Sequence, residues 1–302
     1  MTATGRPPTG RMPSPPGLRR PGSRLGTLLV LCFLAGCAAP PPLPPKHILE
    51  YERQSSAGHE KYAQGYIDQA RSSFQRALTH AELDDSGERI ASALINLGGT
   101  ELLLDDAESA GRLYARALRA ARGVGAGTLE WQAQNGLAEA SRRLGQPDKA
   151  LDLYAFRTNP AWTASNGLIL AADIGRASAL ADVGRVDEAL AMLAGVDAAA
   201  AKGLPETGGA EAAALHARAR ILFKGGRNEE ALAYARRALD KDRLLHHPPS
   251  VAEDHRLIAE ILATAGRDAE AGEHRDRAAA IFSHTGQARR LSTPRHPERT
   301  RL

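Results

Sequence analysis

The stretch Gly58-x-x-x-Tyr62-x-x-Gly65-x-x-x-x-Ala70-x-x-x-Phe74-x-x-Ala77-Leu78 decides the fold of this chain. Large and small residues recur in it every three or four positions, which is the period of a helix with one buried face. Gly65 interrupts this pattern, and glycine commonly ends a helix because it adopts a positive φ without strain. The stretch therefore predicts two helices joined by a tight turn.

A glycine five residues before an alanine recurs along the chain. The pairs are Gly65/Ala70, Gly145/Ala150, Gly184/Ala189, Gly226/Ala231 and Gly266/Ala271, and Asp105 replaces the glycine before Ala110. Aspartate is a tolerable substitute because it visits positive φ more often than most residues. Successive alanines lie 40, 40, 39, 42 and 40 residues apart. Residues 48–284 are therefore predicted to form about six helical hairpins in tandem.

This pattern resembles the helix-turn-helix signature of the tetratricopeptide repeat (TPR) family. Ala110-x-x-x-Tyr114-x-x-Ala117 and Ala150-x-x-x-Tyr154 repeat the second half of that signature. The resemblance implies an all-α, right-handed solenoid, although the period near 40 residues exceeds the roughly 34 residues usual in the family. The sixth hairpin is polar and is expected to cap the array, because no neighbour covers its outer face. A helical bundle without repeats is the alternative.

Residues 1–36 have the three parts of a secretory signal peptide, which we expect to be cleaved. Arg19, Arg20 and Arg24 precede an apolar core at 25–34. This core is too short for a membrane-spanning helix, which needs roughly 20 residues. An ordinary cleaved signal peptide and a buried hydrophobic helix are the two alternatives to the lipoprotein signal described next.

The run Leu34-Ala35-Gly36-Cys37 resembles the lipobox of bacterial lipoproteins. The resemblance implies cleavage before Cys37, whose sulfur then carries a diacylglycerol and whose amine is acylated, for example with palmitate. Several acyl chains on one residue give a stable membrane anchor. Residues 37–47 form a proline-rich tether. Ala38, where an aspartate would signal inner-membrane retention, favours the periplasmic face of the outer membrane.

The composition argues against a nucleic-acid partner. The chain has 39 basic and 35 acidic residues, and five of the basic residues lie within 1–36, so cleavage leaves 34 against 35. Of the two cysteines, Cys32 leaves with the signal peptide and Cys37 is acylated, so no thiol is left for a disulfide, a zinc site or a nucleophile. Residues 285–302 are predicted to be a disordered basic tail.

No catalytic or metal-binding motif stands out in the sequence. His246, His247 and His255 are the densest histidine group, but Pro248 and Pro249 place the first two in a loop. Neither a His-Glu-x-x-His nor a Gly-x-Ser-x-Gly motif occurs. We therefore predict no enzyme activity, no cofactor, no metal and no small-molecule substrate. A weakly active enzyme is the less favoured alternative.

In TPR arrays the first helix of each hairpin lines the concave face, and counting back from each turn alanine assigns that face here. The predicted partner-binding residues are Gln132, Asn135, Glu139, Arg143, His216, Arg220, Lys224, Arg256 and Glu260. Such grooves bind extended or helical segments of other proteins. The expected function is a lipid-anchored periplasmic adaptor for envelope proteins, supporting assembly of an outer-membrane, pilus or secretion machine. A recruiter or regulator of peptidoglycan enzymes is the alternative.

Overall fold

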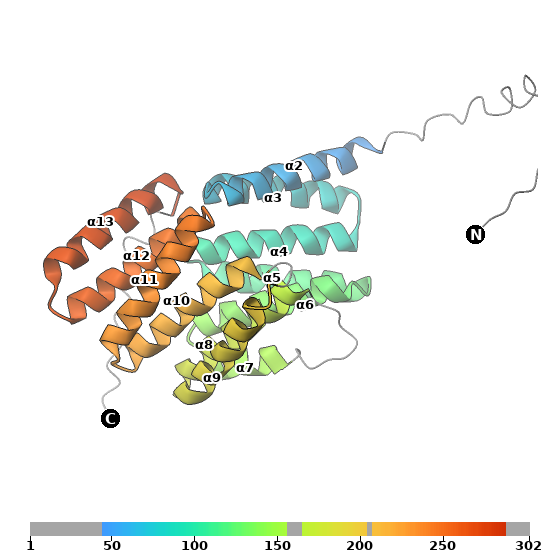
Figure 1. Cartoon of the computed structure of the whole chain (residues 1–302). Coiled ribbons are helices and arrows are strands. Elements are labelled where there is room, and N and C mark those ends of the chain that lie inside the picture. Colours follow the sequence, from blue (N-terminus) through green and yellow to red (C-terminus); the bar gives the residue numbers. More distant parts are fainter. Residues whose placement is uncertain (1–43, 156–164, 204–206, 288–302) are drawn as a thin grey trace, which may run out of the picture. The chain divides into compact units, whose positions relative to one another are not determined.

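The computed structural model describes residues 44–155, 165–203 and 207–287 (Figure 1). These residues form twelve helices and no strand, so the predicted all-α repeat fold is confirmed. None of the described helices is long and apolar enough to cross a membrane. The signal peptide, Cys37 and most of the tether lie outside the described residues, and their predicted roles stay predictions.

The helices pair into six hairpins. Their bounds are α2 Lys46–Ala63, α3 Ile67–Leu83, α4 Gly87–Leu103, α5 Ala107–Gly123, α6 Gly127–Arg143, α7 Pro147–Tyr154, α8 Asn166–Asp182, α9 Val186–Ala200, α10 Gly208–Lys224, α11 Asn228–Leu244, α12 Pro248–Thr264 and α13 Asp268–His284. From α3 to α6 every helix has 17 residues and every turn has three, so that equivalent helices begin 40 residues apart. Longer helices therefore explain the long period.

The predicted turns have the backbone conformation expected of them. The five repeated turn glycines have φ between 73° and 83°. Asp105 also adopts a positive φ, of 65°, which confirms that it takes the place of a glycine. Asp85 and His246 do the same in turns between hairpins, at φ values of 47° and 51°. Turns within hairpins and turns between hairpins therefore both contain a residue with a positive φ. Only the turns within hairpins have glycine at this position regularly.

Aromatic rings of the second helices pack onto glycines of the first helices. Tyr114 of α5 lies between Gly98 of its own hairpin and Gly136 of the next one, where an added Cβ would come within 2.8 Å and 2.2 Å of the ring. Tyr154 of α7 approaches Gly175 of α8 in the same way. A side chain at any of these glycines would occupy the space of the ring, so each glycine forms a socket that joins neighbouring helices.

The apolar core is divided among clusters between neighbouring helices. One cluster joins Phe74, Leu94 and Leu97 of the first two hairpins, and another joins Leu232 and Ile258 of the last two. No single central core forms among the described residues, whose apolar clusters stay local. Each hairpin thus buries its apolar side against a neighbour, as in a solenoid.

The C-terminal boundary of the array differs from the sequence-based prediction. The last hairpin has a largely exposed outer helix, in which only Ala271, Ala278 and Phe282 are buried. The residues after it were assigned to a basic tail at 285–302, but Thr285 and Gln287 are 5% and 0% exposed. The array therefore extends to Gln287, because hydrogen bonds to distant parts of the chain hold these residues. Residues 288–302 lie outside the described part.

Candidate functional site

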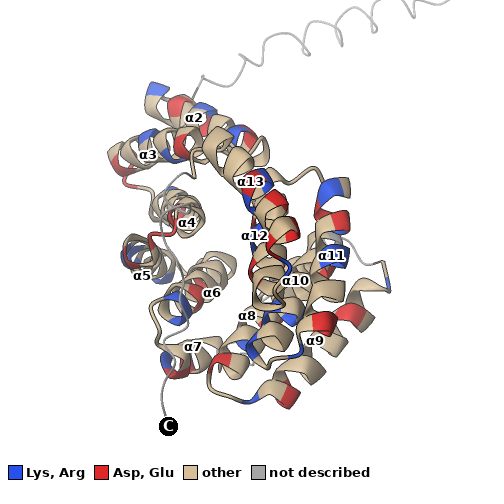
Figure 2. Ribbon diagram, turned by 90° about the vertical axis from the view of Figure 1, so that its left-hand side faces the viewer, with Lys and Arg blue, Asp and Glu red and all other residues tan. Residues whose placement is uncertain are grey.

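The first helices of the hairpins form the inner surface of the array. In chain order α4 packs on α6, α6 on α8, α8 on α10 and α10 on α12. Figure 2 shows these helices around the centre of the array, with α5, α9 and α11 outside them. We define the inner surface as the side chains of these five first helices that face this centre. All nine predicted partner-binding residues belong to three of them, α6, α10 and α12.

Five charged side chains link three of the inner helices, and we call them the charge ladder. Arg142 of α6 donates to Glu139 on its own helix at 2.8 Å and to Asp182 of α8 at 3.0 Å. Lys224 of α10 pairs with the other oxygen of Asp182. Arg143 donates to Glu139 at 2.7 Å and to a backbone carbonyl at the end of α4 at 2.9 Å. The structure thus joins three of the nine predicted residues through Arg142 and Asp182.

Four of the five side chains of the charge ladder are largely shielded from solvent, and Lys224 is 53% exposed. The side chains of Arg142, Asp182 and Glu139 are 8%, 15% and 20% exposed. Burial alone would raise the pKa of Glu139, but the guanidinium groups of Arg142 and Arg143 outweigh it and hold that pKa well below its ordinary value. The ladder therefore contains ionised, mutually paired groups, and its main physical effect is to fix the inner helices against one another.

A second polar cluster lies where α10, α11 and α12 meet. The Nδ1 atom of His216 is 2.6 Å from an oxygen of Asp254, which is fully buried, and Asp242 of α11 is 6% exposed. Burial raises the pKa of both carboxyl groups to about 7, and for Asp242 the adjacent Asp254 adds to the shift. Burial lowers the pKa of His216 to about 3, with Arg220 and Arg256 contributing. The cluster therefore binds protons near neutral pH.

Asp242→Asn is expected to stabilise the protein at pH 8 by about 1–2 kcal/mol and to have a smaller effect at pH 5. The raised carboxyl pKa values mean that the folded state binds protons more tightly than the unfolded state. Stability is therefore lost as pH rises from about 4 to about 7, and the variant avoids part of this loss. Urea unfolding at both pH values measures the difference. Asp240→Asn on the same helix, where the side chain is 74% exposed, is the control; equal effects of the two substitutions would show that the burial of Asp242 does not set this pH dependence.

The other predicted partner-binding residues lie on the inner helices in several environments. Arg256 of α12 donates to Glu253 at 2.6 Å and also pairs with Glu260. Gln132 and Asn135 of α6 are half-buried. Most of the predicted charges thus have partners within the chain. Arg256 finds its partners three and four positions away on its own helix, whereas the partner of Lys224 lies 42 positions away. Contact of the nine residues with a partner protein stays a prediction.

An apolar groove of about 460 Å³ lies between α8 and α10. It is lined by Ser165, Gly167, Leu168, Ala171, Ile174, Gly209, Ala210 and Ala213. Ala171 lies eleven residues before Asp182, and Ala213 lies eleven before Lys224. Eleven residues are three helical turns, so each alanine shares a helix face with a member of the charge ladder. The groove therefore opens on the inner surface. Its lining residues are uncharged and mostly small, so no pattern of charged residues in the sequence indicates it.

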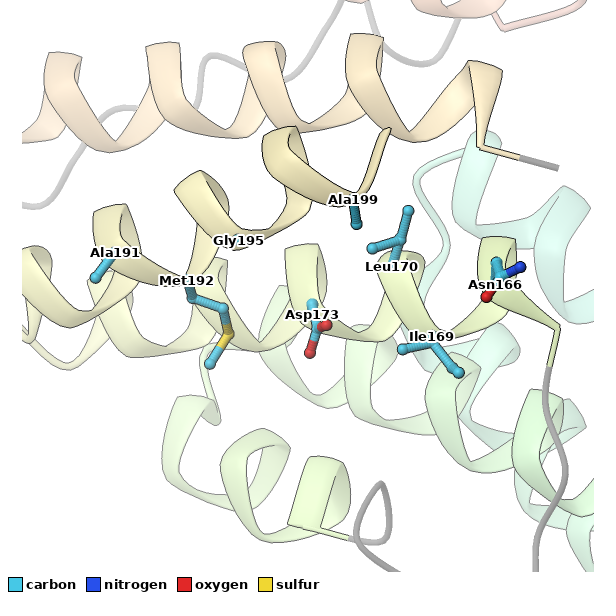
Figure 3. A pocket seen from close by; sticks show the side chains of 8 residues that line it. All are labelled: Asn166, Ile169, Leu170, Asp173, Ala191, Met192, Gly195 and Ala199. Atoms are coloured by element: carbon cyan, nitrogen blue, oxygen red, sulfur yellow. The ribbon is translucent and has the colours of Figure 1, made fainter. Parts of the chain in front are cut away.

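A separate pocket of about 380 Å³ lies between α8 and α9 (Figure 3). Its lining residues are Asn166, Ile169, Leu170, Asp173, Ala191, Met192, Gly195 and Ala199. Asp173 is 8% exposed and is the one ionisable side chain of this lining. None of the predicted partner-binding residues lines it. Across the described ranges, no group of three or more His, Cys, Asp or Glu side chains is arranged to hold a metal ion.

Comparisons with known proteins agree with this architecture. Residues 89–155 match the tetratricopeptide repeat family. The structure resembles the Rap protein solved with Competence and Sporulation Factor, with a TM-score of 0.59 and 16% identity over 82% of this chain and 74% of that one. It also resembles NprR solved with its cognate peptide NprX, with a TM-score of 0.57 and 14% identity over 88% and 75% of the two chains.

At these identities the two solved structures are evidence about the fold and not about a ligand. A comparison of the sequence with curated proteins finds no match. The family match covers nearly all of the second hairpin and the whole of the third, which include the Tyr114 socket and the α6 part of the charge ladder. Residues 89–155 therefore match the tetratricopeptide repeat family, and the described hairpins together share the all-α solenoid fold of the two solved structures.

Proposed function

We propose that this protein is a lipid-anchored scaffold whose inner surface binds an extended segment of another envelope protein. The apolar groove between α8 and α10 is the observation that carries the proposal. Ala171 and Ala213 on its walls are exposed, and Leu168, Ile174 and Ala210 are half-buried. Binding of apolar side chains in an exposed groove of this kind is favourable, because it removes apolar surface from water.

The shape and surroundings of the groove favour a polypeptide segment as the ligand. The groove lies between two neighbouring helices, and the charges of the ladder beyond it are paired with one another, which leaves few of them to bind a free ion. Apolar side chains of a segment would fill the groove, and the polar atoms of the inner surface would contact its backbone. Rap, which shares the fold, was solved with Competence and Sporulation Factor, and NprR was solved with its cognate peptide NprX. This parallel supports a peptide-like ligand here.

The groove can be tested by photo-crosslinking. A photoreactive amino acid at Ala171 or Ala213 is expected to capture one contiguous segment of a single envelope protein, identified by mass spectrometry. The same group at Ala233, an exposed alanine on α11, is the control. Ala213→Arg should weaken binding of the captured protein about tenfold or more, because a cation would enter the apolar groove. Equal capture from Ala233, or full binding by Ala213→Arg, would contradict the proposal.

The lipid anchor and the envelope location form the other half of the proposal. They are supported by the Leu34-Ala35-Gly36-Cys37 run and the apolar core before it. Cys37→Ser should shift the protein from the membrane fraction to the soluble fraction, since the acyl chains could no longer be attached. Cys32→Ser, in the segment expected to be cleaved, should leave it on the membrane. A Cys37→Ser protein that still sediments with membranes would exclude the anchor. We place the scaffold in the assembly of an outer-membrane, pilus or secretion machine.

A further inference from the structure

The two ends of the helical array are in contact. The N–H of Ile67, at the start of α3, donates to the carbonyl of Thr285 at 3.1 Å. The side-chain amide of Gln287 donates to the carbonyl of Leu103, at the end of α4, over a separation of 184 residues and a distance of 2.8 Å. Figure 1 shows the end of α13 beside the turn between α2 and α3. We call these four residues, with Gly286, the end joint.

Two turn glycines show how closely the ends approach. An added Cβ at Gly286 would lie 2.6 Å from a carboxylate oxygen of Asp68, and one at Gly65 would lie 3.2 Å from the methyl group of Thr285. The turn glycines Gly125, Gly145, Gly184, Gly226 and Gly266 would each place a Cβ in open space. Gly65 and Gly286 are therefore required for a close contact as well as for a positive φ.

The end joint differs in kind from the contacts between consecutive hairpins. Consecutive hairpins share apolar clusters, whereas no cluster formed by the described residues contains side chains of both the first and the last hairpin. Two hydrogen bonds, a contact between the rings of Tyr62 and His247 and a few close van der Waals contacts hold the ends together. A net hydrogen bond changes an equilibrium by roughly fivefold to tenfold. The end joint is thus the weakest contact around the array.

We infer that the end joint is a clasp that opens while the hairpins stay folded, and that its opening gives a partner segment access to the inner surface. The second part rests on the proposed function. Separation at the end joint breaks two hydrogen bonds, the contact of the Tyr62 ring with His247 and a few van der Waals contacts, whereas separation at any other position would expose an apolar cluster to water. In the closed form the first and last hairpins complete the circle of helices, which would keep a bound segment in place.

The opening itself can be measured by amide hydrogen exchange without a ligand. The Ile67 amide should exchange faster than core amides of α5, such as that of Ala117, because clasp opening precedes unfolding. Gln287→Ala should speed exchange at Ile67 roughly fivefold to tenfold and leave α5 unchanged. Gln146→Ala is a matched control, because Gln146 also follows a positive-φ glycine but is exposed. Equal rates at Ile67 and Ala117, or equal effects of the two substitutions, would overturn the clasp.

The link to binding can be tested with a covalent lock. The Cβ of Asp68 lies 3.3 Å from the position of a Cβ at Gly286, close to the spacing of a disulfide. We would combine Asp68→Cys, which removes the carboxylate that a Cβ at Gly286 would meet, with Gly286→Cys in the full chain, and compare the oxidised and reduced forms. The oxidised form should slow exchange at Ile67 to the core rate and lose capture of the partner segment at Ala213. Capture by both forms would refute gated access but leave the groove intact, and capture by neither would refute the groove.

Discussion

Replacing Tyr114 with alanine is expected to lower the free energy of unfolding by about 3–5 kcal/mol, the usual cost of deleting a buried aromatic ring. The ring is 6% exposed and fills the space between Gly98 and Gly136. Its removal leaves a cavity between two hairpins, and neither glycine has a side chain that could move into it. Urea unfolding followed by circular dichroism would measure the loss.

Tyr66→Ala is the matched control for this experiment. Tyr66 is 43% exposed and lies at the turn of the first hairpin, so its loss should change the free energy of unfolding by only about 0.5 kcal/mol. If both substitutions have the same small effect, the ring of Tyr114 does not join the second and third hairpins. A repeat array can also unfold in parts, and loss of helical signal in two steps would indicate separation at this socket.

Arg142→Ala should cost roughly 3 kcal/mol, because it leaves Glu139 and Asp182 charged and shielded from water without their shared partner. The low pKa of Glu139 sets the pH range of this effect. A depressed carboxyl pKa contributes stability above the unfolded pKa, and this contribution is lost as pH falls towards the folded pKa. The variant should therefore show its largest deficit near neutral pH and a smaller one in acid.

Arg112→Ala provides the control for Arg142. Arg112 pairs with Glu108 on the surface of α5, where the two side chains are 63% and 77% exposed. Such a pair contributes little, and its loss should cost no more than about 0.5 kcal/mol. Urea unfolding at neutral pH compares the two variants. An Arg142→Ala protein as stable as Arg112→Ala would show that the charge ladder does not hold α6 against α8.

Local residue spacing was sufficient to predict the fold of the described region. Turn glycines repeat about every 40 residues, and a helix places positions three and four apart on one face, so hairpins and their inner faces follow from counting. Asp105 was recognisable because aspartate tolerates positive φ. The sequence did not show whether longer helices or longer turns make the period long. From α3 to α6 each helix has 17 residues and the turns are short, so the helices account for the long period.

Interactions between distant residues could not be predicted in the same way. Asp182 completes the charge ladder from a helix in which no residue had been singled out, and Asp254 pairs with His216 from 38 positions away. Each of these pairs depends on how consecutive hairpins rotate against one another. The contact of Gln287 with Leu103 requires the summed rotation of all hairpins, which no local pattern encodes.

The contact between the first and last hairpins also fixes how many hairpins this protein can have. An open-ended solenoid gains or loses whole repeats easily, since each one needs only its neighbours. Here a duplicated or deleted 40-residue repeat would carry Thr285 and Gln287 away from Ile67 and Leu103. Changes in repeat number, a common route by which such proteins diversify, would therefore be selected against in this chain, and variation should appear in the side chains of the inner surface instead.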